Sequence, residues 1–390
     1  MARTTKKAKT TAKKAKTKTT KKTKKTVRKP TKDVEAFVSG GQFMVAAPPT
    51  GPVTLDEARA IARATRPEVA VRAAVAAVAV PQSPEAVGDE RQQLERKRRE
   101  ERARRIADYK ETMEIMKARG ARPLPEAAAG GIDVDATTAD AGFVPLQILA
   151  EGDSWFDYPP FFFTGGGLIT RLERGLGVPI LNMAKAGDEV RYMLGVEERI
   201  ELTERLTEGS PAGDPWDVML FSGGGNDIVD NPMALWVRDF DPAVPPAALI
   251  HQPRFEAALA LVRAGYEDLI ALRNALSPTT HLVFHAYDRA IPDGRDVCGF
   301  GPWLKPTFDL RGFPAALASR QPVIDAMLAQ FAAMLTTLEG PDVTFINGQG
   351  TLPQQAASWH NELHPTRAGF DKFAAIFREK LKQLFPARVA

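Results

Sequence analysis

The chain has 390 residues and is predicted to contain an α/β domain in which helices cover both faces of a five-stranded parallel sheet. Two observations predict this fold class. Short apolar runs alternate with segments of helical periodicity, a pattern typical of parallel sheets flanked by helices. Polar or glycine-rich segments follow three of these runs, at the sheet edge where such folds bind ligands. We expect a three-layer α/β/α domain over residues 143–390.

Apolar runs of four to six residues predict the strands, and apolar residues spaced three and four apart predict the helices. The predicted strands are, in order, Leu146–Ala150, Val178–Asn182, Val218–Phe221, His281–Ala286 and Val343–Ile346. The predicted helices are Leu168–Arg174, Arg254–Ala275, Pro322–Leu338 and Thr366–Leu384.

The chain before residue 121 differs in composition. Residues 1–32 contain 15 of the 52 Lys and Arg of the chain and no Asp or Glu. Such a segment buries too little apolar surface to offset the entropy of ordering, so we expect a disordered basic tail. In an accessory helical region, residues 33–120, Thr54 is a suitable cap for a helix that continues towards Pro81. Asp89–Lys117 predicts a highly charged helix that is solvated or forms oligomers.

Several classes of protein are disfavoured by what the sequence contains. The prolines and glycines of residues 121–142 predict a linker. Cys298 is the only cysteine, which argues against a disulfide scaffold or a cysteine zinc site. We recognise neither a secretory signal nor a membrane span, and expect a cytoplasmic protein. The glycine clusters do not complete a phosphate-binding motif. His360 and His364 lie four apart as in a metalloprotease helix, but Glu362 stands third rather than second and Pro365 disfavours helical geometry at His364. We therefore expect neither a metal nor a cofactor.

A serine and a histidine form the most informative pair in the chain. Ser154 follows the first predicted strand in Gly-Asp-Ser-Trp, and His364 ends the sequence Asn-Glu-Leu-His before the last predicted helix. A hydroxyl becomes a useful nucleophile when a nearby base can take its proton. We therefore expect Ser154 to be the nucleophile and His364 to act as general base and then as general acid.

Three groups are candidates for an oxyanion hole, which needs donors aimed at the developing negative charge. They are the backbone N–H groups of Ser154 and Gly187 and the side-chain amide of Asn226. Each of these residues follows a predicted strand, so they converge with His364 on the carboxyl edge of the sheet. Singly, each motif is also typical of a helix cap or a turn. Their occurrence together favours a hydrolase.

The order and local sequence of these four residues resemble the SGNH family, also called GDSL esterases and lipases. The resemblance runs from about Leu146 to about Leu384 and implies a flavodoxin-like fold. It also implies hydrolysis of carboxylic esters, such as lipids, thioesters or acetylated sugars, without a metal. Trp155 stands where the family usually has Leu. Asn361 stands where the family usually has Asp, three residues before the histidine.

The identity of the group that orients His364 is left open by the sequence. An amide at Asn361 can accept a hydrogen bond from the imidazole but brings no charge to stabilise an imidazolium. In a serine protease the comparable change from Asp to Asn lowers turnover by about 10⁴, partly because the wrong tautomer is held. Glu362, Asp288 or a backbone carbonyl near Trp359 are the alternatives to Asn361.

The substrate is a second question that the sequence leaves open. Trp155, Phe161 and Phe162 lie just after the nucleophile and could form an apolar wall for an acyl group. An equally good interpretation is a loop anchored on the core.

The basic tail suggests an alternative function. Its composition is similar to the tails of linker histones and of Lys/Ala-rich nucleoid proteins, and lysine-rich disorder binds polyanions by counterion release. The chain would then be a nucleoid- or polyanion-associated protein with a weak or inactive hydrolase domain. A merely solubilising tail is the other interpretation.

Deletion of residues 1–32 tests the alternative. We expect the full chain to bind DNA without sequence preference, with an affinity that falls steeply as salt rises. The truncated chain should lose this binding in a gel-shift titration at two salt concentrations. Equal retention of DNA by the full and truncated chains would contradict the assignment to the tail.

Overall fold

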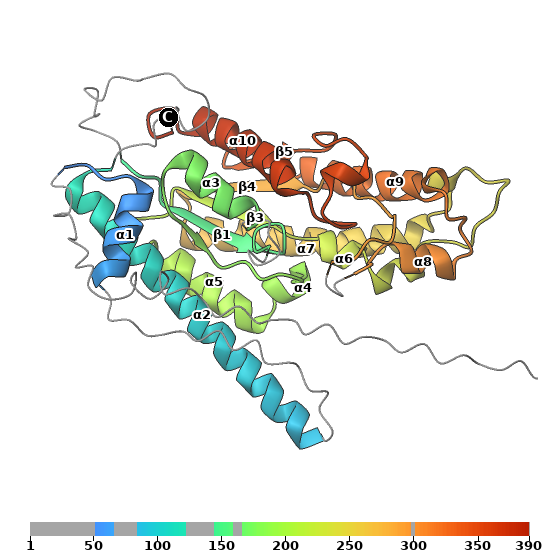
Figure 1. The fold of residues 1–390 in the computed structure, drawn as a ribbon, viewed down its shortest axis with the longest axis horizontal. Helices are drawn as coiled ribbons and strands as arrows, with labels where there is room; N and C mark the ends of the chain where they lie inside the picture. The colour runs from blue at the N-terminus through green and yellow to red at the C-terminus, as the bar shows by residue number, and fades with distance from the viewer. Residues whose placement is uncertain (1–50, 66–83, 122–143, 159–165, 298–300, 390) are drawn as a thin grey trace, which may run out of the picture. The chain divides into compact units, whose positions relative to one another are not determined.

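The computed structural model describes residues 51–65, 84–121, 144–158, 166–297 and 301–389 (Figure 1). Its strands are β1 (Ile148–Gly152), β2 (Ile180–Asn182), β3 (Val218–Ser222), β4 (His281–Ala286) and β5 (Val343–Asn347). Its helices are α1 (Leu55–Thr65), α2 (Pro84–Arg119), α3 (Leu168–Leu176), α4 (Val190–Met193), α5 (Val196–Glu208), α6 (Gly225–Ile228), α7 (Gln252–Leu276), α8 (Lys305–Leu310), α9 (Leu317–Thr336) and α10 (Arg367–Leu384). Short 3-10 turns η4 (Asn231–Leu235), η5 (Pro246–Ala248) and η6 (Ala356–Ser358) lie between them.

The five strands form one parallel sheet in the order β2-β1-β3-β4-β5. Every residue of β1 and β3 is buried, as expected when helices cover both faces, and both strands are apolar except for Glu151 and Gly152 in β1 and Ser222 in β3. The predicted α/β class is therefore confirmed, and each predicted strand occurs with ends shifted by two residues or fewer. β1 lies at the point where the strand order reverses, which is where such sheets bind ligands.

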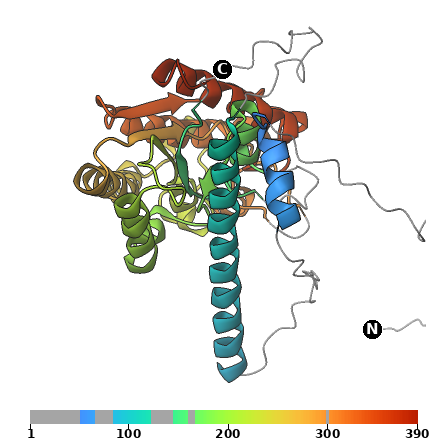
Figure 2. The ribbon, with the colours of Figure 1, turned by 90° about the vertical axis from the view of Figure 1, so that its left-hand side faces the viewer.

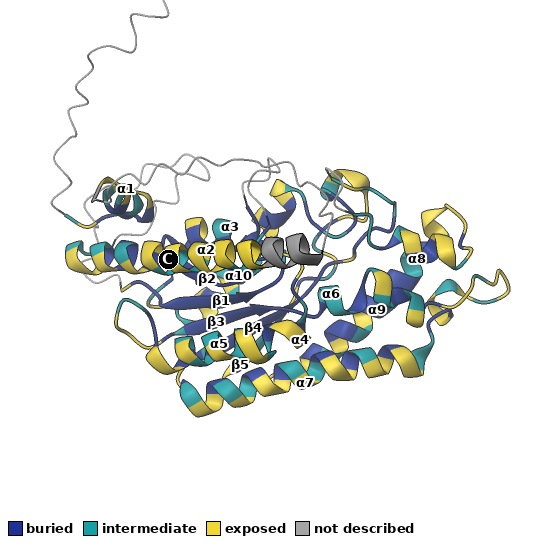
Figure 3. Cartoon of the chain, turned by 90° about the horizontal axis from the view of Figure 1, so that it is seen from below, coloured by how far each residue is buried: buried dark blue, intermediate teal, exposed yellow. Residues whose placement is uncertain are grey.

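The helices form two layers (Figure 3). α3 and α10 pack together on one face of the sheet, and α5, α7 and α9 cover the other. The sequence analysis did not predict α5, because its exposed Val196 and Ile200 obscure the apolar face that Leu202 and Leu206 bury. The predicted helix at Pro322 begins five residues earlier, at Leu317, so that Pro322 lies inside α9.

Two helices precede the sheet (Figure 2). Thr54 caps α1 as predicted: its Oγ1 accepts from the N–H of Glu57 at 3.4 Å, and its own N–H donates to the Glu57 carboxylate at 2.7 Å. The prediction of a solvated second helix is wrong for the C-terminal half of α2. Its Tyr109 and Met113 join the main core, and Met116 packs against α1.

Several sequence predictions concern residues outside the described ranges. They are the basic tail at 1–32, most of the linker at 121–142 and the part of the first helix that was expected to continue from 66 to Pro81. Within the described part of the chain, no helix has both the length and the apolar composition needed to cross a membrane.

Gly152, at the end of β1, provides a test of how closely the strands approach. A Cβ at this position would lie 2.7 Å from the carbonyl oxygen of Ser222 and 2.8 Å from its Cβ. We expect Gly152→Ala to lower the free energy of unfolding by about 1–3 kcal/mol through overpacking, measured by urea denaturation. Gly340→Ala, whose Cβ would meet nothing within 4 Å, is the control. Equal stability of the two variants would contradict this account.

Candidate active site

Ser154 lies in a tight turn at the carboxyl end of β1. The N–H of Asp153 donates to the carbonyl of Ser222 on β3 at 3.0 Å, which continues the sheet for one residue. The carbonyl of Asp153 then accepts from the N–H groups of Phe156 and Asp157 at 3.1 and 3.0 Å. The backbone thus turns away from the sheet at Ser154 and exposes its hydroxyl at this edge.

The carboxylate of Asp153 fixes this turn from inside the protein. It accepts hydrogen bonds from the N–H of Trp155 at 3.0 Å, from Ser222 Oγ at 2.9 Å and from the hydroxyl of Tyr287. Burial raises the pKa of Asp153 to about 6, although these three donors act in the opposite direction. Both oxygens of the Asp153 carboxylate are engaged in these contacts. Asp153 therefore fixes the turn of residues 153–157, which we call the nucleophile turn because it carries the predicted nucleophile Ser154.

His364 reaches Ser154 from a loop that precedes α10. The loop is closed at its base, where the N–H of His360 donates to the carbonyl of His364 at 2.8 Å and the N–H of Thr366 donates to that of Ser358 at 3.0 Å. His364 Nε2 lies 2.7 Å from Ser154 Oγ. The structure therefore brings together two groups that are 210 residues apart in the sequence, at hydrogen-bonding distance for proton transfer.

The group beside the other ring nitrogen is Asn361, whose Oδ1 lies 3.0 Å from His364 Nδ1. This oxygen also accepts from the backbone N–H groups of Leu363 and His364, at 2.9 and 2.8 Å. Both are fixed donors, so the oxygen of the amide, and not its NH₂, must face the imidazole. Nδ1 then carries the ring proton, and Nε2 presents its lone pair to Ser154. The Asn361 NH₂ group donates to the hydroxyl of Tyr158 at 3.2 Å.

The geometry separates two consequences of having an amide at Asn361. His364 is held in the tautomer that a general base needs. The part of the fall in turnover that a wrong tautomer causes in the protease variant is therefore not expected here. The counter-charge for an imidazolium is still missing. Burial, together with the neighbouring His360, lowers the pKa of His364 to about 3. The imidazole is therefore neutral across the physiological pH range, with the lone pair of Nε2 unprotonated.

The two alternative carboxylates are occupied elsewhere. Glu362 accepts from four backbone N–H groups between Gly294 and Lys305, at 2.6 to 3.1 Å. Asp288 accepts from the N–H groups of Gly350 and Leu352, at 2.6 and 2.8 Å. Both carboxylates thus stabilise loops around the site through backbone hydrogen bonds. The contact with His364 Nδ1 is made by Asn361.

The predicted oxyanion donors lie on three neighbouring segments. Asn226, in the first turn of α6, donates one Nδ2 hydrogen to the carbonyl of Asp188 at 2.7 Å, which leaves its second hydrogen for a ligand. Gly187 has φ of 81°, a left-handed conformation that glycine adopts without strain. Neither the N–H of Ser154 nor that of Gly187 donates to another described residue. These N–H groups have the free donor capacity that an oxyanion hole needs.

A small cavity of about 40 Å³ opens beside Ser154, Asn226 and His364. Its remaining walls are mainly apolar and include Ile228, Val229, Ala290, Ile324, Met327, Leu328 and Leu363. Trp155 also borders the cavity, but it is only 3% exposed and its ring packs against Phe370 and Phe373. Phe161 and Phe162, the other proposed wall residues, lie outside the described residues. Gly187 is not among the lining residues.

The sequence analysis missed two contributions to this site. Ile324, Met327 and Leu328 come from α9, whose apolar residues look in sequence like any core-facing stripe. Tyr158 links Asn361 to His360, because its hydroxyl lies 2.6 Å from His360 Nδ1. A tyrosine followed by prolines carries no sequence signal for such a role.

Comparison with known proteins gives a likeness of fold. No protein-family model and no curated protein matches the chain. Among solved structures, it is similar to a lipase from a goat rumen metagenome, with 16% identity and a TM-score of 0.39 over 60% of this chain and 96% of that one. An extracellular lipase from Streptomyces rimosus matches with 15% identity and a TM-score of 0.39, over 60% and 99% of the two chains. A family 3 carbohydrate esterase from Talaromyces cellulolyticus matches with 12% identity and a TM-score of 0.35, over 62% and 98%.

The role of Asn361 can be tested through the pKa of His364. In Asn361→Asp, a carboxylate beside Nδ1 favours the charged imidazolium, so the pKa should rise by about 1–3 units. The chain has five histidines, few enough for NMR titration of histidine-labelled protein, with His364→Gln to assign the signal. Asn361→Leu, which offers neither charge nor acceptor, is the control. An unchanged His364 titration in the Asp variant would contradict the contact.

Proposed function

We propose that this protein hydrolyses carboxylic esters through an acyl-enzyme formed on Ser154. The observation that carries the proposal is the chain of contacts from Ser154 Oγ to His364 Nε2 and from His364 Nδ1 to Asn361 Oδ1, at 2.7 and 3.0 Å. It matches the roles of nucleophile, base and orienting group in serine hydrolases.

In the first half of the reaction, Ser154 Oγ attacks the ester carbonyl while His364 Nε2 takes its proton. The negative charge that forms on the carbonyl oxygen is stabilised by the N–H groups of Ser154 and Gly187 and by the free amide hydrogen of Asn226. His364 then gives its proton to the leaving alcohol, and the acyl group remains on Ser154. Water, activated by the same imidazole, hydrolyses this intermediate and regenerates the serine.

The cavity beside Ser154 favours a short acyl group. The cavity is small, about 40 Å³, and its walls from α6 and α9 are apolar. A short acyl chain needs little space beside Ser154, whereas a long chain would have to extend beyond this cavity. We therefore place short-chain esters ahead of long-chain lipids as substrates.

A second candidate function is binding of a nucleic acid or another polyanion through residues 1–32. The binding function is supported by the positive charge of that segment. The accompanying hypothesis, that the α/β domain is inactive, is based on the amide at Asn361. This hypothesis is weakened by the orientation of the amide, because its oxygen faces Nδ1 and favours the tautomer of His364 that suits catalysis.

The proposed function is tested with p-nitrophenyl esters whose acyl chains range from two to ten carbons. We expect turnover to be highest for the shortest chains, and Ser154→Ala and His364→Ala to lower kcat by about 10³-fold or more. His281→Ala, at the opposite end of β4, is the matched histidine control and should retain activity.

Circular dichroism of each variant checks that folding is intact. A parent chain with no more turnover than Ser154→Ala on every ester would overturn the enzyme assignment. A preference for ten-carbon chains would overturn only the short-chain assignment.

A further inference from the structure

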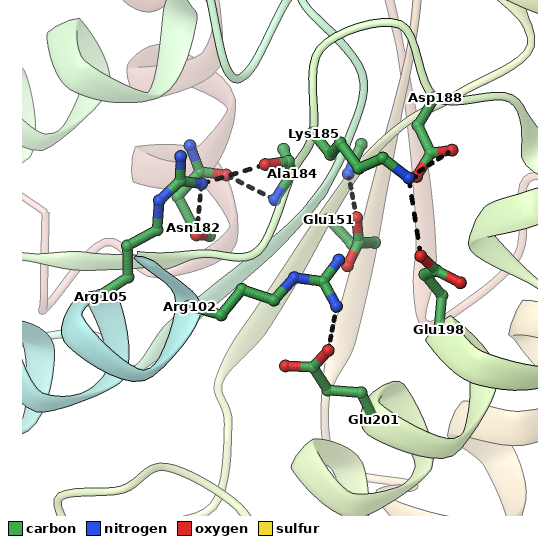
Figure 4. A network of polar contacts seen from close by, with 10 residues as sticks. Arg102, Arg105, Glu151, Asn182, Ala184, Lys185, Asp188, Glu198 and Glu201 are labelled. Atoms are coloured by element: carbon green, nitrogen blue, oxygen red, sulfur yellow. Dashed lines mark hydrogen bonds and ion pairs between the residues drawn. The ribbon is translucent and has the colours of Figure 1, made fainter. Parts of the chain in front are cut away.

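Arg105, on helix α2, contacts two of the segments that build the candidate active site. Its Nη1 donates to the carbonyls of Asn182 and Ala184, at 3.2 and 3.0 Å, where β2 leads into the loop that carries Gly187 (Figure 4). Its Nη2 donates to the carboxylate of Asp157 at 2.9 Å. A single planar guanidinium therefore joins the two segments, which is a geometry that arginine provides and lysine does not.

Both segments lead directly to oxyanion donors. Asp157 closes the turn that begins at Asp153, since its N–H donates to the Asp153 carbonyl at 3.0 Å, and Ser154 lies inside that turn. On the other segment, the N–H of Lys185 donates to the carbonyl of Gly152 at 2.8 Å. Gly187 follows two residues later.

The loop around Gly187 also holds the third donor. The carbonyl of Asp188 accepts from Asn226 Nδ2 at 2.7 Å. Lys185 Nζ lies 3.5 Å from the carboxylate of Asp188 and 3.6 Å from that of Glu198 on α5. A displacement of this loop would therefore move both Gly187 and Asn226 relative to Ser154.

Arg102, one turn earlier on α2, forms an ion pair with Glu201 on α5, and its charge also acts on the buried carboxyl of Glu151 on β1 (Figure 4). α2 has a further attachment to the α/β domain away from these segments, at Lys117, which forms an ion pair with Asp214. Arg104, on the same helix, is exposed.

We propose that Arg105 is a positioning residue, which sets the spacing between the oxyanion donors on the nucleophile turn and those on the Gly187 loop. The inference rests on the proposed function, and it assigns part of the catalytic support to a helix that precedes the α/β domain in the sequence. Oxyanion donors act on charge that exists only in the transition state. A change in their spacing should therefore affect kcat much more than KM.

The experiment compares four variants of the full chain on p-nitrophenyl acetate. We expect Arg105→Ala to lower kcat by about 10- to 100-fold with KM changed less than about twofold. Arg105→Lys, which offers a point charge in place of a fork, should recover only part of this loss. Lys117→Ala and Arg104→Ala, which each remove one positive charge from the same helix, should stay close to the parent.

Two further measurements distinguish positioning from a general loss of structure. Methylboronic acid forms a tetrahedral adduct on a catalytic serine, and its affinity should fall in parallel with kcat/KM in Arg105→Ala. Amide hydrogen exchange should accelerate in residues 182–188 of that variant, while the core strand β3 stays protected.

The outcomes separate this inference from the proposed function. Parental kcat in Arg105→Ala, with activity lost in Ser154→Ala, would overturn the role of Arg105 and leave the enzyme assignment intact. Equal losses in Lys117→Ala and Arg105→Ala would show that only docking of α2 matters, and would also overturn it. A parent chain without ester turnover would overturn the proposed function, and this inference with it.

Discussion

The buried carboxylate of Asp153 links the ends of three strands at the carboxyl edge of the sheet. It accepts from Trp155 in the turn after β1, from Ser222 at the end of β3 and from Tyr287 just after β4. Burial of a carboxylate costs free energy unless hydrogen-bond donors surround it. Displacement of any of these three donors would therefore destabilise the folded protein. The backbone that carries Ser154 is thereby fixed with respect to the strand that leads to Asn226.

The contact of Asn361 with His364 resembles the one that a carboxylate makes with the histidine of serine hydrolases. Two N–H groups of the same loop orient the amide, and the amide oxygen orients the imidazole. The ring is held in the tautomer that a general base needs, but an imidazolium would have no counter-charge at this position. Under the proposed mechanism, stabilisation of the transition state therefore depends more heavily on the oxyanion donors.

The support of those donors extends beyond the α/β domain. α2 contributes Tyr109 and Met113 to the core of that domain and places Arg105 against the two segments that carry Ser154 and Gly187. A charged helix with sparse apolar residues thus makes both kinds of contact on one face, while most of its residues 92–101 are exposed. The α/β domain and α2 are coupled through these contacts.

The sequence by itself determined the α/β class, the five strands and the convergence of Ser154, Gly187, Asn226 and His364 on one edge of the sheet. These follow from local rules: apolar runs predict buried strands, and parallel strands place the segments that follow them at the same edge. Only the tertiary structure decided that Asn361, rather than Glu362 or Asp288, faces His364, that the α9 side chains line the cavity, and that Arg105 contacts the segments beside it. Asn361 and Glu362 both lie within three residues of His364, so their spacing does not tell which side chain turns towards the ring. Arg105 and α9 are far from Ser154 in the sequence, and their contacts depend on how the folded chain brings distant segments together.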